Sequence, residues 1–409
     1  MSTPERRQKL KLFIVMPLIV VLAAVMAYIG LGLLDSAAPE PKFTATNLTI
    51  ESGSKSKINW PSYGQSAIAT KNYGAVARHG ETKPQPTAST AKLITALAVM
   101  KKAPFDDEAG ETITFTDKDV ESYQKYVDGG GTVARVEAGL TWTYYQAVEA
   151  ILLASSNNVS DSLAIKVFGS LDNYREYAQQ MVKDLGMNNT TIGVDASGYD
   201  PSTVSTADDM ALLALAAIED PMIRQIVAMS QVDLPVAGHI ENTNHLLVNG
   251  DVIGMKTGWI PEAGGTFVLV GEQTDGGHSQ KIAVVVMGDP SGPGASTQND
   301  AYELFKSAKQ NFSYQEPVTK GQVLGSLDPA WAEHLVSVQS TESIGTFVWA
   351  GQKPEIKVEP NGSFIGKKSS PGRVVVKVAN WQQESPLELS QPLSEPSLKW
   401  RLIDRYLPN

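Results

Sequence analysis

The stretch PTASTAKLITALAVM, residues 86–100, sets two small hydroxyl residues directly before an apolar segment. Its apolar residues recur at three- and four-residue intervals, which predicts a helix that buries one face. Ser89 opens this helix and Lys92 follows three residues later on the same face, so their side chains are expected to lie side by side. A desolvated lysine can lose its proton near neutral pH and accept one from a serine hydroxyl. A helix cap at Ser89 with a solvated Lys92 explains the same spacing equally well.

The Ser-x-x-Lys spacing is weak support by itself, because Ser54 and Lys57 repeat it in a polar part of the chain. A second polar stretch, LLASSNNVSDSLA at residues 152–164, follows a strongly apolar helical segment. It holds two overlapping Ser-x-Asn patterns, which begin at Ser155 and at Ser156. A turn between two helices accounts for these residues when the stretch is taken alone.

A third stretch, GMKTGWIPEAGGTFVLV at residues 254–270, places Lys256, Thr257 and Gly258 at the start of a strand-like segment. Glycine in a strand leaves room for a ligand or another backbone to approach closely. A positive charge and a hydroxyl on a strand edge can hold a carboxylate while the strand pairs with an extended peptide. A plain turn is the alternative for this stretch too.

In the order Ser-x-x-Lys, Ser-x-Asn, Lys-Thr-Gly, the three stretches match the signature of penicillin-binding proteins and serine β-lactamases. Residues of about 57–312 resemble the D-alanyl-D-alanine carboxypeptidases, the low-molecular-mass penicillin-binding proteins of the S11 peptidase type. The surrounding text resembles that family as well, in STADDMALLA, NTNHLL and GMKTGWIPEAGG.

The resemblance implies a role for each matching position. It implies Ser89 as the acylated nucleophile and Lys92 as its base. It favours Ser155 and Asn157 over the overlapping pattern, with Ser155 relaying a proton and Asn157 holding the substrate amide. The remaining implied positions are Lys256, Thr257 and Gly258 for substrate binding and the backbone N–H groups of Ser89 and Trp259 for the oxyanion hole.

The resemblance also implies an α+β fold, in which helices lie beside a five-stranded antiparallel sheet. Helical spacing predicts helices over residues 91–103, 143–155, 171–187 and 206–220. Residues 264–273 and 281–290 predict two strands of a hairpin. The sequence predicts the first strands of the domain less clearly. Residues 65–82 lack the pair of Asp and Gly that marks the opening hairpin in the family.

The composition changes after residue 313 to short strand-like pieces with Gly and Pro between them. We expect the catalytic domain to span residues 57–312 and a small β-rich accessory domain to span 314–409. The accessory domain resembles that of the family more loosely.

The N-terminus carries a charge-free apolar run over residues 12–34, long enough to cross a bilayer core of about 30 Å. Four basic residues precede it and none follows directly, so residues 1–11 are expected in the cytoplasm and the rest of the chain outside. A cleaved signal peptide is the less favoured alternative, since its apolar region is shorter. Residues 35–56 are expected to form a polar spacer.

Composition excludes other classes of function. The 409 residues carry 34 Lys and Arg against 44 Asp and Glu, a net charge of -10, so no basic surface for nucleic acid is expected. The chain has no cysteine, which excludes disulfides, thiolate catalysis and cysteine-ligated metals. The five histidines have no metal-site spacing, and we expect neither a metal nor a cofactor.

These observations favour a membrane-anchored serine DD-carboxypeptidase that acts on peptidoglycan stem peptides ending in D-Ala-D-Ala and is acylated by β-lactams. A β-lactamase or a DD-endopeptidase would use the same residues. Efficient β-lactamases of the related class deacylate with a positioned Glu, and no Glu-x-x-x-Asn pattern lies between Ser155 and Lys256. A non-catalytic wall-binding or penicillin-sensing protein is the alternative from another class.

Overall fold

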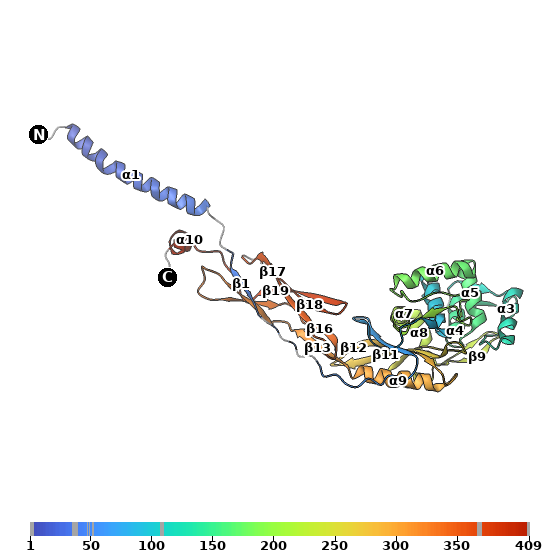
Figure 1. Ribbon diagram of the computed structural model, residues 1–409. Helices are drawn as coiled ribbons and strands as arrows, with labels where there is room; N and C mark the ends of the chain where they lie inside the picture. The colour runs from blue at the N-terminus through green and yellow to red at the C-terminus, as the bar shows by residue number, and fades with distance from the viewer. Residues whose placement is uncertain are drawn as a thin grey trace.

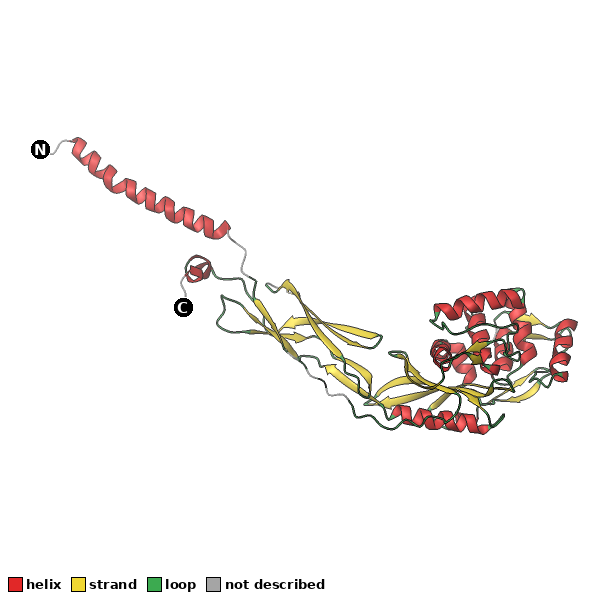
Figure 2. Cartoon of the chain, in the orientation of Figure 1, coloured by secondary structure: helices red, strands yellow, loops and turns green. Residues whose placement is uncertain are grey.

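The computed structural model of the chain describes residues 4–34, 40–46, 48, 50, 53–106, 110–365 and 370–406. Figure 1 shows an elongated molecule, with a helix at the N-terminus, a β-rich part in the middle and a mixed part of helices and strands at the far end. Both chain termini lie at the end opposite the mixed part. Figure 2 shows that the large helices other than the N-terminal one gather in that mixed part.

The mixed part is built on a five-stranded antiparallel sheet, as predicted. In spatial order its strands are β10 (Val252–Ile260), β11 (Gly264–Asp275), β12 (His278–Asp289), β2 (Gln65–Thr70) and β3 (Gly74–Gly80). The expected hairpin is confirmed in β11 and β12. The hairpin of β2 and β3 forms without the family's Asp and Gly, because Gly74 takes the left-handed conformation at φ 66°.

Both faces of this sheet are buried, so its central strands are almost continuously apolar. Successive side chains point to opposite faces, and accordingly Val268 and Val270 belong to one apolar cluster and Phe267 and Leu269 to another. The first cluster packs against a group of helices and the second against α9 (Ala295–Lys309). The helical group consists of α2 (Lys92–Lys102), α4 (Tyr144–Leu152), α5 (Asn157–Phe168), α6 (Leu171–Asp184), α7 (Ala207–Glu219) and α8 (Pro221–Val227).

The helix boundaries follow local capping chemistry. Thr143 and Gln146 form a capping box at the start of α4. Asp220 caps α8 and is followed by proline at the first helical position. Gly169, at φ 87°, ends α5. The four predicted helices at residues 91–103, 143–155, 171–187 and 206–220 are confirmed in α2, α4, α6 and α7.

Shorter elements connect these helices and strands. A 3-10 turn, η1 (Ala88–Ala91), leads directly into α2. The others are β4 (Gln85–Pro86), β5 (Thr112–Thr114), α3 (Asp117–Asp128), β6 (Thr141–Thr143), β7 (Val204–Ser205), β8 (Gln231–Leu234), β9 (Gly238–Glu241) and η2 (His245–Val248).

The residues after 311 form a β domain. A two-stranded sheet joins β13 (Phe312–Val318) to β16 (Ile344–Trp349). The other strands make a six-stranded sheet in the order β1 (Lys42–Ala45), β14 (Val323–Asp328), β15 (Val336–Ser340), β19 (Trp381–Leu389), β18 (Ser370–Val378) and β17 (Glu355–Ser363).

Strand β1 comes from the segment expected to be a polar spacer. Its four residues pair with β14 in antiparallel register, and Phe43 packs against the apolar core of the β domain. The sequence of β1 does not predict a strand, because Phe43 among mostly polar neighbours gives no alternating pattern.

The β domain is packed firmly against the mixed domain. Phe347 and Trp349 join the apolar cluster that also contains Phe267 and Leu269 of the five-stranded sheet. The Trp349 backbone N–H donates a 3.0 Å hydrogen bond to Tyr73 Oη. The two domains therefore share a core.

Helix α1 (Pro4–Leu34) is apolar enough to cross a membrane, with a mean hydropathy of 2.6 over Ile14–Leu31, and that window is exposed. Its Tyr28 hydroxyl donates a hydrogen bond to Leu402 O in α10 (Leu398–Leu402). A turn, η3 (Asp404–Tyr406), follows α10. Length and composition fit either a membrane anchor or a signal sequence.

Candidate active site

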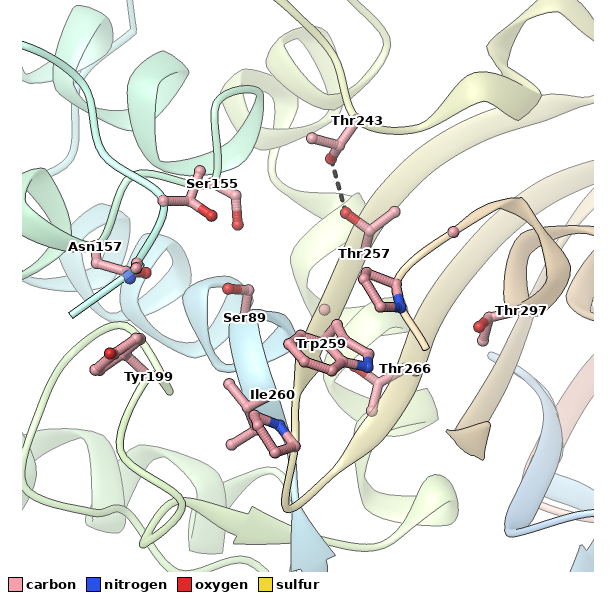
Figure 3. Close-up of a pocket in the computed structure, with 18 of the residues that line it drawn as sticks. Ser89, Ser155, Asn157, Tyr199, Thr243, Thr257, Trp259, Ile260, Thr266 and Thr297 are labelled. Atoms are coloured by element: carbon pink, nitrogen blue, oxygen red, sulfur yellow. Dashed lines mark hydrogen bonds between the residues drawn. The ribbon is translucent and has the colours of Figure 1, made fainter. Parts of the chain in front are cut away.

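A cleft of about 740 Å³ lies between the helical group and edge strand β10. The six predicted residues that line it come from three segments of the chain, as Figure 3 shows for most of them. They are Ser89, Ser155, Asn157, Thr257, Gly258 and Trp259. The two remaining predicted residues, Lys92 and Lys256, are fully buried beside the cleft.

Lys92 is in direct contact with Ser89. The Lys92 side chain is 0% exposed, and its Nζ lies 2.9 Å from Ser89 Oγ, 2.7 Å from Asn157 Oδ1 and 2.9 Å from Ser197 O. Ser89 lies inside η1 and is the cap of neither η1 nor α2. The alternative of a capping serine with a solvated lysine is therefore wrong.

The hydrogen-bond partners of Lys92 fix how its neutral form must be oriented. Asn157 Oδ1 and Ser197 O can only accept hydrogen bonds. A neutral amine has two N–H groups, which these two oxygens take, so its lone pair is left for the Ser89 hydroxyl. In that form, the Ser89 O–H donates to Lys92 Nζ, which is the arrangement that proton transfer from serine requires.

Burial also makes the neutral amine accessible near physiological pH. It lowers the pKa of Lys92 to about 7, although the carboxylates of Asp195 and Asp161 oppose this shift. Burial in turn raises the pKa of Asp161 to about 6. Asp161 accepts hydrogen bonds from the Tyr126 hydroxyl and the Ala196 backbone N–H, which hold it near the lysine.

Ser155 and Asn157 face the cleft from the junction of α4 and α5. Ser155 adopts a positive φ of 59°, a strained conformation for a residue other than glycine. No hydrogen bond within the described residues occupies its hydroxyl. Ser156 and Asn158, which form the overlapping Ser-x-Asn pattern, have structural roles instead. Ser156 Oγ caps α5, and the Asn158 side chain is hydrogen-bonded to the backbone of Ala134.

Thr257 lines the other end of the cleft on β10, and Lys256 is buried beside it. Burial holds the pKa of Lys256 well below its usual range, and the charge of nearby Lys92 adds to this effect. The Lys256 ammonium donates a 3.2 Å hydrogen bond to Thr257 O. The Thr257 hydroxyl lies 2.7 Å from the Thr243 hydroxyl, as the dashed line in Figure 3 marks.

Gly258 lets β10 approach the helix that carries Ser89. A Cβ atom at this position would stand 2.9 Å from Ser89 N and 2.5 Å from Thr266 Oγ1, closer than side-chain carbons pack. The Ser89 backbone and the adjoining Trp259 backbone are thereby brought to the same part of the cleft. Two neighbouring backbone N–H groups can stabilise an oxyanion.

Several residues at this site had no assigned role in the sequence analysis. Thr243 lies in the stretch NTNHLL, which resembles the family, and this resemblance is the sequence feature that could have indicated a role for it. Ser197 and Asp195 belong to a loop far along the chain, and no spacing rule connects them to Lys92. Within the described residues, no group of three His, Asp or Glu side chains is arranged to hold a metal ion.

The chain is similar in sequence to known proteins of one family. The profile of the peptidase S11 family, described as D-alanyl-D-alanine carboxypeptidase, matches residues 64–291, more than half of the chain. A D-alanyl-D-alanine endopeptidase of Escherichia coli is 28% identical over 194 residues, 45% of this chain and 59% of the relative. The D-alanyl-D-alanine carboxypeptidase DacB2 of Mycobacterium tuberculosis is 30% identical over 212 residues, 49% of this chain and 66% of the relative. The chain thus spans less than two thirds of the length of these two curated relatives.

Solved structures show the same fold over more of the chain. A peptidoglycan synthesis regulatory factor (PBP3) of Streptococcus pneumoniae superimposes with a TM-score of 0.62 at 18% identity, over 80% of this chain and 98% of its own. Penicillin binding protein 5 of Haemophilus influenzae superimposes with a TM-score of 0.60 at 18% identity, over 84% of this chain and 99% of its own. At such low identity these similarities establish the fold, including the β domain, and nothing further.

Proposed function

Because the chain belongs to the peptidase S11 family of serine D-alanyl-D-alanine carboxypeptidases, we propose that it removes the terminal D-alanine from peptidoglycan stem peptides through an acyl-enzyme on Ser89. The single observation that carries this proposal is the 2.9 Å contact of Ser89 Oγ with the fully buried Lys92 Nζ. It supplies a serine with an adjacent base whose pKa is about 7.

In the first step, Ser89 Oγ attacks the carbonyl carbon between the last two D-alanines. The hydroxyl proton passes to Lys92 Nζ as the C–O bond forms. The negative charge that develops on the carbonyl oxygen is stabilised by the backbone N–H groups of Ser89 and Trp259. The peptide C–N bond then breaks, and the leaving amine takes a proton from Lys92 through the Ser155 hydroxyl.

Three sets of contacts hold the peptide so that its scissile carbonyl lies at Ser89. The terminal carboxylate lies against Lys256 and the Thr257 hydroxyl. The peptide runs along β10, whose outer edge has no strand partner within the described residues and can pair with an extended chain. Asn157, which is hydrogen-bonded to Lys92, also contacts the substrate amide.

Water completes the cycle by attacking the acyl carbon. The ester C–O bond breaks, one proton from water returns to Ser89 Oγ, and the shortened peptide leaves with a new carboxylate. A β-lactam would acylate the same serine by opening its ring, and its amine would stay attached and hinder the approach of water.

The apolar helix α1 supports a proposal on the location of the protein. We propose that this helix remains as a single membrane span, with residues 1–11 in the cytoplasm and the cleft outside. The mass of the mature protein in membranes distinguishes the two possibilities. A chain that begins near residue 35 would show that α1 is a cleaved signal, and an intact N-terminus would support the anchor.

Endopeptidase activity is the second candidate, and the similarity to the Escherichia coli endopeptidase favours it. The chemistry is the same, but the leaving amine belongs to a second stem peptide. Products from a cross-linked stem dimer and from a linear pentapeptide distinguish the two activities.

The test of the main proposal uses the full-length protein in detergent and a stem pentapeptide ending in D-Ala-D-Ala. Mass spectrometry should show the loss of one D-alanine. Ser89→Ala should remove both this activity and labelling by fluorescent penicillin. Ser54→Ala is the matched control, because Ser54 has the same Ser-x-x-Lys spacing outside the cleft, and it should change neither. An unchanged pentapeptide, or a Ser89→Ala protein that still labels, contradicts the proposal.

A further inference from the structure

The cleft around Ser89 carries different charges at its two ends. In Figure 3, Thr243 and Thr257 lie on one side of Ser89, and Tyr199 and Ile260 lie on the other. Buried Lys256 belongs to the Thr257 end. Two carboxylates line the cleft: Asp200 directly follows Tyr199 in the sequence, and Glu262 stands two residues after Ile260. Among the described residues, no lysine or arginine lines the cleft.

The proposed substrate orientation brings a defined part of the peptide to this acidic end. With its terminal carboxylate at Thr257 and its scissile carbonyl at Ser89, the peptide continues toward Ile260. Two residues of extended chain span about 7 Å. The third residue from the carboxyl end therefore lies beyond Ser89, toward the Tyr199 and Ile260 side of the cleft (Figure 3), near which Asp200 and Glu262 stand in the sequence.

Asp200 is held rigidly by the loop that also contacts Lys92. Its backbone N–H donates a 2.7 Å hydrogen bond to Asp195 Oδ2, and its Oδ1 accepts one from Ser202 N at 2.9 Å. In the same loop, Ser197 O accepts from Lys92 Nζ. Asp200 Oδ2 has no hydrogen-bond or ion-pair partner within the described residues, so one oxygen remains for a ligand.

Glu262 is at the tip of the turn that joins β10 to β11. Ile260 and Ala263 on either side are buried, and the Ala263 backbone N–H donates to Ile260 O at 3.1 Å. Pro261 restricts the turn further, since its φ is fixed. Glu262 itself is exposed, and no cation pairs with it in the part of the chain that the structure describes. A fixed turn thus presents a free carboxylate at the mouth of the cleft.

We infer that Asp200 and Glu262 bind the side-chain ammonium of the diamino acid that precedes the two D-alanines in a peptidoglycan stem peptide. This inference rests on the proposed function. An ammonium group has three N–H donors, so more than one carboxylate oxygen can accept a hydrogen bond from it. Acylation of that amine, as in a cross-linked stem, removes the charge and one or more donors. The acidic end therefore selects stems whose amine is free.

The ammonium can belong to lysine or to diaminopimelate, in which a carboxylate is attached to the same carbon. Among the described residues that line the cleft, the basic side chain is His245, which lies near Thr243 in the sequence, and no lysine or arginine is there to pair with that additional carboxylate. Like charges close together repel each other. The site consequently favours lysine, or diaminopimelate with an amidated carboxylate, over free diaminopimelate.

The test compares peptides of the form Nα-acetyl-X-D-Ala-D-Ala with the full-length protein in detergent. X is lysine, Nε-acetyl-lysine, diaminopimelate or amidated diaminopimelate. Exposed ion pairs contribute modestly, so kcat/KM should be about threefold to tenfold higher for lysine than for Nε-acetyl-lysine. This ratio should fall toward one at high salt, because salt screens exposed charges.

The variants Asp200→Asn and Glu262→Gln remove the charges with little change in shape. The asparagine keeps an oxygen that can accept the Ser202 hydrogen bond. Each should lower the ratio between the lysine and Nε-acetyl-lysine peptides, and the double variant should bring it close to one. Glu176→Gln is the control for net charge, because Glu176 is exposed on α6 and does not line the cleft. It should leave the ratio unchanged.

The outcomes separate this inference from the proposed function. Equal kcat/KM for the lysine and Nε-acetyl-lysine peptides overturns the inference and leaves the carboxypeptidase in place. The same conclusion follows if the variants slow both peptides equally and keep the ratio. A higher kcat/KM for the free diaminopimelate peptide than for the lysine peptide contradicts the conclusion that the ammonium belongs to lysine or to amidated diaminopimelate. If no peptide is cleaved, the proposed function fails, and this inference fails with it.

Discussion

Asn157 Oδ1 accepts a 2.7 Å hydrogen bond from Lys92 Nζ, which joins the first residue of α5 to the first residue of α2 beneath the cleft. Both side chains are almost completely buried. Asparagine satisfies one N–H of the lysine without adding a charge. The amine of Lys92, which we propose as the base, can therefore stay neutral in a site where a carboxylate at the same position would keep it protonated.

Asn157→Asp should move the pH profile of acylation to higher pH. A carboxylate next to Lys92 favours the charged amine and should raise its pKa from about 7 by about 1 to 3 units. Since only the neutral amine accepts a proton from Ser89, the rising limb of the profile moves with that pKa. The rate of labelling by fluorescent penicillin between pH 6 and 10 measures the shift.

The control for this substitution is Asn188→Asp, which adds the same charge at an exposed position outside the cleft. Its profile should match that of the parent, with a midpoint near 7. An Asn157→Asp profile with an unchanged midpoint would show that Lys92 is not the group whose titration limits acylation.

Substrate binding should depend on pH in the opposite direction to acylation. Burial holds the pKa of Lys256 well below its usual range, so its ammonium loses a proton more easily than that of an exposed lysine. A carboxylate needs the ammonium form, and binding must then take up a proton. KM for a D-Ala-D-Ala peptide should rise with pH while kcat rises through about pH 7, where Lys92 loses its proton. Steady-state kinetics at several pH values measures both.

A peptide ending in a carboxamide is the control for Lys256, because it has no carboxylate to bind. Its KM should be higher and should change little with pH. If KM for the free acid were also independent of pH, Lys256 would not be the group that recognises the carboxylate.

How far the sequence determined this site depends on the distance along the chain. Ser89 and Lys92 are three residues apart on one helical turn, so their contact could be predicted from spacing. The contact between Lys92 and Ser197 joins residues 105 positions apart, and no local pattern encodes it. The choice between the Ser155 and Ser156 patterns likewise depends on which side chain faces the cleft, which the backbone at the α4–α5 junction determines.

In the fold, too, local features could be predicted from the sequence, and contacts between distant residues could not. Strands β11 and β12 are long and apolar, and their hairpin could be predicted from composition alone. Strand β1 could not, because its pairing with β14 depends on an edge supplied by residues almost 300 positions later. The core that the two domains share could not be predicted either. The apolar side chains of Phe347 and Trp349 indicate that they are buried, but the sequence does not indicate which residues they pack against.

Gly258→Ala should abolish most acylation without unfolding the protein. The added methyl group would stand 2.9 Å from Ser89 N and 2.5 Å from Thr266 Oγ1, so β10 must move away from the serine. Displacing one donor of an oxyanion hole costs about 100-fold or more in rate. The second-order rate of penicillin acylation measures the loss, and circular dichroism checks the fold.

Gly250→Ala is the matched control, since nothing lies within 4 Å of a Cβ atom at that glycine. It should acylate at the parental rate. Full activity in Gly258→Ala would mean that the close approach of β10 to Ser89 is not needed for the reaction.

Thr243 is predicted to act by orienting the Thr257 hydroxyl, which lies 2.7 Å from its own. Thr257→Val would remove the proposed hydrogen bond to the substrate carboxylate and should lower kcat/KM by about tenfold or more. Thr243→Val removes only the neutral bond that holds this hydroxyl and should cost about threefold to tenfold. Thr243→Ser keeps a hydroxyl and should restore activity. If Thr243→Val cost nothing in the parent, or cost as much in a Thr257→Val background as in the parent, Thr243 would not act through Thr257.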